Sequence, residues 1–131
     1  MTVTLPRPVV TTPSSPYADM RGRRRKITYT QPDGAAATIV TVSHNKARQT
    51  YDVSIQPITI EAKDGYSIQG FHGFSGVQVA RVPAGPRFSA KKIEEVTAKT
   101  IENVEVMVAA DEKIARLFTD PGAASQEMFP R

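Results

Sequence analysis

The hydrophobic pattern of this 131-residue chain changes its period once. Between residues 26 and 82, apolar and polar side chains alternate in short runs, which turn signals such as 31–34 and 63–65 separate. From Ser89 onward, apolar residues recur at spacings of three and four. A period of two predicts half-buried strands, and the longer spacing predicts amphipathic helices. We therefore expect one α+β domain, in which an antiparallel sheet of about five or more strands precedes two C-terminal helices.

The strand region is rich in β-branched residues, which favour strands. Pro57 should interrupt one run with a bulge or place it at an edge, because proline lacks the N–H that a sheet ladder uses. The polar segment 44–50 is expected to be a loop. The expected strands are 27–30, 38–43, 51–60, 66–71 and 77–82.

Two polar residues are positioned to cap the helices. Ser89 precedes the first apolar series, and Asp111 precedes a shorter series that ends before residues 120–122. Residues 104–108 also alternate, so a further strand there is the alternative, but the spacing over the longer window favours a helix. The apolar positions of the two helices are Ile93, Val96, Thr100, Ile101, Val104, Val108, Ile114, Leu117 and Phe118.

The two faces of the sheet differ in character. Two helices can cover only one face of such a sheet, so the other face should be polar or bind a partner. Alternation predicts that the helix-covered face carries Thr38, Val40, Val42, Tyr51, Val53 and Ile55. It predicts that the open face carries Ile39, Thr41, Ser43, Asp52, Ser54 and Gln56. Short polar side chains can approach bases and phosphates closely, although a merely solvated face has the same composition.

Positive charge is concentrated near the N-terminus. Residues 1–26 hold six basic side chains against Asp19 alone, whereas the rest of the chain holds 11 basic and 12 acidic residues. Residues 1–25 also contain four prolines and should form an extended arm, with a possible edge strand near Val3 and Leu5. Clustered cations attract polyphosphate, so nucleic acid is the expected partner. A membrane surface, an acidic protein or no specific partner are the alternatives.

Several function classes find no support in the composition. The chain has no cysteine and two histidines, so thiolate chemistry is excluded and a zinc site is not expected. No nucleophile elbow or catalytic triad signature is present, and we expect neither an enzyme nor a cofactor. No apolar run approaches the length of a membrane span, and prolines interrupt the short apolar stretch at the N-terminus. We expect a soluble, non-secreted protein.

Residues 42–53, VSHNKARQTYDV, resemble the hairpin of single-stranded RNA bacteriophage (levivirus-type) coat proteins. In that family a strand rich in Val, Ser and Thr leads through a basic loop to an aromatic residue that opens an alternating strand. The order of strands and helices over about residues 26–120 is similar too. The resemblance implies an intertwined homodimer with a continuous sheet, which assembles into an icosahedral shell and binds genomic RNA on the face opposite the helices.

The resemblance also implies roles for particular residues. The strand positions would contact bases or phosphates, and the loop positions would contact the RNA backbone. The implied contacts are Thr41, Ser43, Asn45, Lys46, Arg48, Ser54 and Gln56. Asp52, Ser54 and Gln56 depart from the family, which often has Lys or Arg on these strands, and the Pro-rich, Arg-rich N-terminal segment is unlike its tight opening hairpin. These departures put binding of one specific RNA hairpin in doubt, and packaging of RNA in general less so. Separately, the charge of Arg23, Arg24 and Arg25 predicts an RNA tether in the arm.

The leading interpretation is thus a capsid protein, located in the virion and, during assembly, in the host cytoplasm. The runner-up is a small single-stranded nucleic-acid-binding regulator that builds no shell. The low aromatic content of 7% favours the coat protein, because such regulators usually stack bases on exposed rings. A protein-interaction module that docks through its arm is a third possibility.

Overall fold

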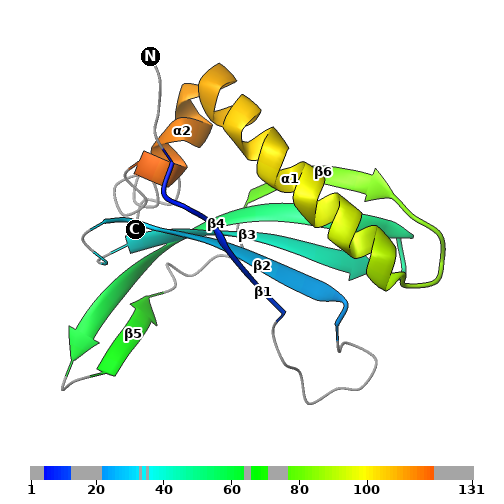
Figure 1. The fold of residues 1–131 in the computed structure, drawn as a ribbon, viewed down its shortest axis with the longest axis horizontal. Coiled ribbons are helices and arrows are strands. Elements are labelled where there is room, and N and C mark those ends of the chain that lie inside the picture. Colours follow the sequence, from blue (N-terminus) through cyan, green and yellow to red (C-terminus); the bar gives the residue numbers. More distant parts are fainter. Residues whose placement is uncertain are drawn as a thin grey trace.

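The structure is a computed structural model that describes residues 5–12, 22–32, 34, 36–63, 66–70 and 77–119. It has the predicted α+β architecture, with an antiparallel sheet followed by two helices over one face (Figure 1). The helices are α1 (Ala90–Ala110) and α2 (Glu112–Thr119). The strands are β1 (Val9–Thr11), β2 (Arg24–Thr30), β3 (Ala36–Asn45), β4 (Thr50–Lys63), β5 (Tyr66–Gly70) and β6 (Val77–Pro83).

The sheet is organised around β4, which pairs with three strands. Strands β1 to β4 are neighbours in sequence order, and β3 pairs along one edge of β4. The other edge of β4 is shared, since β6 pairs with residues 50–55 and β5 with residues 59–63. Pro57 faces Thr38 of β3 and lies between these two pairings, where no described residue of β5 or β6 is its partner. A residue without an N–H therefore fits there, and of the two predicted alternatives the edge position is confirmed, because this stretch of β4 has no described partner on its second edge. The predicted bulge is not at Pro57; the bulge lies at Val53 and Ser54.

Strands β2 to β6 differ from the predicted strands by up to three residues at their ends, and three differences from the predictions bear on the site. β2 begins at Arg24, so the end of the basic cluster is part of the sheet rather than of the arm. The predicted loop 44–50 is shorter, because β3 extends through Asn45. The edge strand of the arm forms at Val9–Thr11, whereas Leu5 is outside any strand and Val3 lies outside the described residues.

Both predicted caps are confirmed. The Ser89 hydroxyl accepts a hydrogen bond from the Lys92 N–H at 3.2 Å, and the Asp111 carboxylate accepts one from the Lys113 N–H at 2.9 Å. These bonds satisfy amide groups that have no partner within a helix. Residues 104–108 are part of α1, so the helix interpretation of this segment is confirmed.

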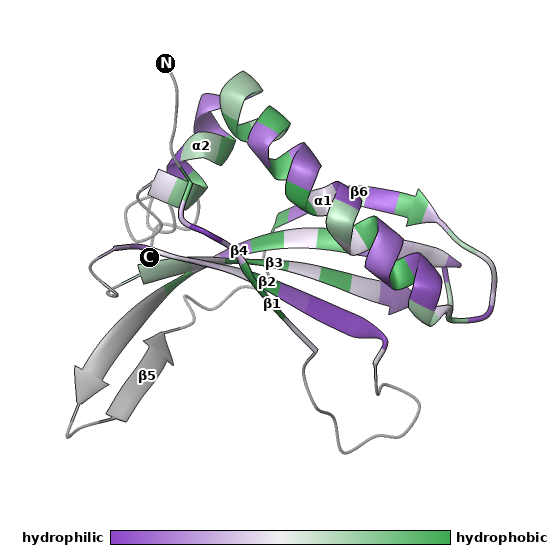
Figure 2. Cartoon of the chain, viewed as in Figure 1, coloured by the Kyte–Doolittle hydropathy of each residue, from purple (hydrophilic) through white to green (hydrophobic). Residues whose placement is uncertain are grey.

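The main core lies between the sheet and the two helices, and α1 packs on β2, β3 and β4. Figure 2 shows more and less hydrophobic residues alternating along β3, the coloured part of β4 and α1, as two half-buried surfaces require. The Thr38 hydroxyl donates to the Leu117 carbonyl and joins β3 to α2. All six side chains predicted for the helix-covered face are buried there or beside it, which confirms the face assignment: Thr38, Val40, Val42, Tyr51, Val53 and Ile55.

The opposite face of the sheet is not polar over its whole length. Ala37, Ile39 and Ile58 are almost fully buried and form a second apolar cluster. Ile39 was predicted to lie on the open polar face; it does point to that side, but only 4% of it is exposed. The polar part of this face is therefore confined to the end where β2, β3, β4 and β6 lie together.

Candidate nucleic-acid interface

Two rows of polar side chains cross the open face of the sheet. In an antiparallel sheet, residues directly opposite each other on neighbouring strands point to the same side. The pairing registers therefore place one residue from each of β2, β3, β4 and β6 in a line. The first row is Arg24, Ser43, Asp52 and Arg81, and the second row is Lys26, Thr41, Ser54 and Gln78. We call these the open-face rows.

Three of the four rim positions of the open-face rows are cationic, and the central positions carry three hydroxyl groups and the Asp52 carboxylate. Arg24 and Arg81 are exposed on β2 and β6, while Thr41, Ser43 and Ser54 are half-buried between them. Neighbouring strands lie about 4.8 Å apart, so each row spans roughly 14 Å from β2 to β6. Guanidinium and hydroxyl groups are the donors that usually bind phosphate and sugar oxygens. The arrangement can therefore hold a short stretch of a polyanion.

Strand alternation divides the basic cluster at residues 23–26 between the two sides of the sheet. Arg24 and Lys26 belong to the open-face rows. Arg25 points to the helix side, where 8% of the residue is exposed and its Nε lies 2.7 Å from Glu94. The Arg23 guanidinium lies 5.9 Å from the ring centre of Phe88, which precedes α1. The structure thus brings Arg24 to the other predicted contacts and places Arg23 and Arg25 apart from them.

The end of the β3–β4 hairpin is built by Asn45 and Asp52. The Asn45 amide donates to the Asp52 carboxylate at 3.0 Å and accepts from the Arg48 N–H at 3.1 Å. The Thr50 hydroxyl donates to the same carboxylate at 2.6 Å. The Asn45 side chain is therefore engaged in shaping the loop, and the side chains of Lys46 and Arg48 stand exposed on it.

Asp52 is held as a carboxylate. Partial burial raises its pKa. The hydrogen bonds from Thr50 and Asn45 and the charges of Arg81 and Arg48 together lower the pKa by more than burial raises it, so the pKa lies below its ordinary value. The Arg81 Nε lies 3.9 Å from the Asp52 carboxylate. Asp52 therefore anchors the hairpin and orients Arg81.

Ser54 and Gln56 alternate on β4 as predicted, and both are half-buried on the open side. Gln56 lies opposite the buried Ile39, one row beyond Ser54. It therefore sits at the border between the polar rows and the apolar cluster.

The open-face rows also contain Lys26, Gln78 and Arg81, which were not among the predicted contacts. Lys26 could have been found, because it has the opposite parity to the buried Ile27 and Tyr29. Arg81 and Gln78 could not be assigned from the sequence, since their position depends on β6 pairing with the first half of β4.

A groove of about 360 Å³ lies on the helix side, between α1 and β6. Its rim is charged through Lys92, Glu95 and Lys99. Its apolar lining includes Val53, Val79, Ala80, Val82, Val96 and Met107. The groove adjoins β6, and none of the other described strands pairs with the outer edge of β6.

Within the described ranges, no three His, Asp or Glu side chains are grouped in a way that could hold a metal ion. Neither helix of the described part is long and apolar enough to span a membrane. No family model, curated protein or solved structure matches this chain.

Proposed function

We propose that this protein is the coat protein of a single-stranded RNA bacteriophage, which dimerises, assembles into a shell and holds RNA against the open-face rows. The observation that carries the proposal is the asymmetry of the sheet. Two helices cover one face, and the other face presents cations and hydroxyl groups at one end. The resemblance of residues 42–53 to the coat-protein hairpin supports the same function.

The chemistry of the open-face rows favours contacts to the RNA backbone over base recognition. Arg24, Lys26 and Arg81 supply positive charge, and no aromatic side chain belongs to either row. Phosphate contacts position a nucleic acid without reading its sequence, whereas stacking needs exposed rings. Packaging of RNA with modest sequence preference follows from this composition.

The outer edge of β6 supports the proposed dimer. An unpaired edge strand presents free N–H and C=O groups and can pair with a second copy of itself. A twofold axis at this edge would extend the sheet and bring each partner over the adjoining apolar groove. Such a dimer would also double the length of the open-face rows.

The test is expression of the full chain and analysis of the purified material. We expect light scattering after size exclusion to show dimers or larger assemblies, negative-stain microscopy to show particles of uniform size, and the absorbance ratio at 260 and 280 nm to reveal bound nucleic acid. A stable monomer at micromolar concentration would contradict the assembly claim.

A single-stranded nucleic-acid-binding regulator is the second candidate. The observation in its favour is that both open-face rows are complete within one chain. This candidate predicts binding of oligonucleotides with a steep salt dependence and no particles in the microscope.

A further inference from the structure

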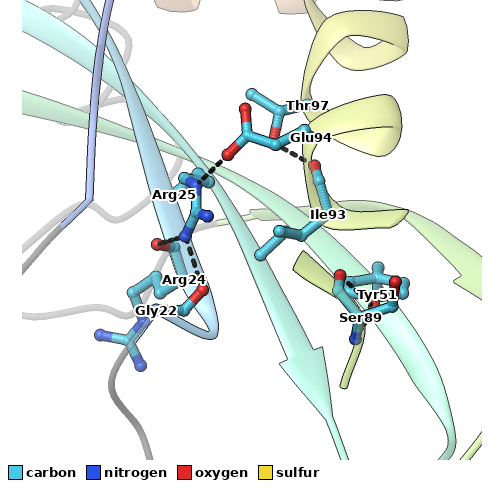
Figure 3. Close-up of polar contacts among 8 residues, drawn as sticks. All are labelled: Gly22, Arg24, Arg25, Tyr51, Ser89, Ile93, Glu94 and Thr97. Carbon is cyan, nitrogen blue, oxygen red and sulfur yellow. Dashed lines mark hydrogen bonds and ion pairs between the residues drawn. The ribbon is translucent and has the colours of Figure 1, made fainter. Parts of the chain in front are cut away.

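The Arg25 guanidinium donates three hydrogen bonds, one of which joins β2 to α1 (Figure 3). Its Nε donates to the Glu94 carboxylate at 2.7 Å, and its Nη1 donates to the carbonyls of Gly22 and Arg24 at 2.6 and 3.0 Å. Only 10% of the Arg25 side chain is exposed, against 61% for Glu94. Arg25 is therefore a nearly buried cation, and its acidic partner among the described residues is Glu94 of α1.

The two carbonyl bonds fix the backbone on both sides of Arg24. Gly22, with a φ of +73°, turns the chain into β2, and the pairing of β2 with β3 begins at Arg24 opposite Ser43. Residues at the start of a strand fray unless other contacts hold them. Arg25 supplies those contacts, and the Arg24 side chain leaves the backbone on the opposite side, toward the open face.

The charges of the basic cluster do not by themselves determine which of its residues lie on the open face of the sheet. Residues 23–26 are all cationic, so either parity of the strand would place two cations on each side of the sheet. The buried Ile27 and Tyr29 fix the parity of the middle of β2. At the start of β2, Arg25 connects the strand to α1 through its ion pair with Glu94.

We infer that Arg25, held by Glu94, is a positioning residue that fixes Arg24 on the RNA-facing side of the sheet. This inference rests on the proposed function. Removing an acidic residue from a protein that binds RNA normally strengthens binding, because the protein becomes more positive. The positioning role of Arg25 predicts the opposite effect for Glu94. Loss of the Glu94 carboxylate should instead weaken binding, since it leaves Arg25 buried without its acid and frees the start of β2.

The experiment compares Glu94→Ala with Glu95→Ala in the full chain. Both residues are exposed, both are in α1, and both changes raise the net charge by one. Of the two side chains, it is Glu94 that forms the ion pair with Arg25. Affinity for a fluorescently labelled single-stranded RNA of mixed sequence is measured over a range of salt concentrations, with circular dichroism to verify folding.

The expected result is about threefold weaker binding for Glu94→Ala, with a salt slope lower by about one, because one phosphate contact is lost. Glu95→Ala should bind as the unchanged protein does, or slightly more tightly. Glu94→Gln carries the same charge as Glu94→Ala but keeps an oxygen that can accept from Arg25, so it should retain most of the affinity. If Glu94→Ala does not fold, Glu94→Gln is compared with Glu95→Ala instead, and binding by Glu94→Gln as tight as or tighter than that of Glu95→Ala would then overturn the positioning role.

Equal binding by Glu94→Ala and Glu95→Ala, or by Glu94→Gln and Glu94→Ala when both are folded, would overturn the positioning role. Failure of the unchanged protein to bind the RNA would instead overturn the proposed function.

Discussion

Individual side chains on β2 carry the strongest claim about RNA. Arg24 and Lys26 lie on the open face, whereas Arg23 lies against Phe88 on the helix side. Replacing Arg24 and Lys26 together with Gln should therefore reduce RNA affinity across all sequences and lower the salt slope by about two. Salt-dependent binding to labelled RNA measures this change.

The matched control for that prediction is Arg23→Gln, which also removes a cation from the same cluster. It should change the salt slope far less. Equal effects per charge at residues 23, 24 and 26 would mean that the cluster acts as a disordered tether rather than as part of the sheet.

Asp52 gives a prediction about pH. Its pKa is lower in the folded protein than its ordinary value, so its ionisation stabilises the fold above that value and the contribution is lost as the pH falls through the folded pKa. Asp52→Ala should lower the free energy of unfolding at pH 7 by about 1 kcal/mol, because the bonds from Thr50 and Asn45 are lost. Urea unfolding at pH 7 and pH 3 should show this difference shrinking in acid, and a constant difference would contradict the assigned role.

At the residue scale, the sequence could predict on which face of the sheet a strand side chain lies. Alternation predicted the sides of Val40, Val53, Thr41 and Ser54, because side chains on a strand must alternate. It could not reveal the burial of Arg25, since that depends on how α1 docks and brings Glu94 to β2.

At the scale of elements, α1 is held by one buried face. Ile93 is fully buried against the sheet, whereas Val106 on the same helix is 67% exposed. Ile93→Ala should lower the free energy of unfolding by about 2–5 kcal/mol through lost packing and a cavity. Val106→Ala should stay within about 0.5 kcal/mol, and thermal or urea unfolding of both variants checks the contrast.

The caps, the helices and five of the six strands could be predicted because each depends on local periodicity or on one capping residue. The order of strands could not, because β5 and β6 share one edge of β4 and no local pattern specifies that choice. Pro57 illustrates the limit: proline predicted a bulge or an edge, and only the pairing of β4 with both β5 and β6 shows that it lies at a locally unpaired edge.

At the scale of the whole molecule, the outer edge of β6 and the adjoining groove are the surfaces through which the proposed dimer forms. A charge on the apolar floor of the groove should oppose burial by a second copy. Val79→Asp should therefore shift the protein toward monomers, as light scattering would show. Lys99→Asp at the charged rim is the control, and loss of dimers in both variants or in neither would contradict a dimer built on this groove.

The central claim is that RNA lies on the open-face rows, and ultraviolet cross-linking of the purified RNA–protein assembly followed by mass spectrometry tests it most directly. The account predicts cross-links in the peptides that contain Lys26, Thr41, Ser43 and Ser54. Cross-links confined to α1 and α2, with those peptides unmodified, would contradict it.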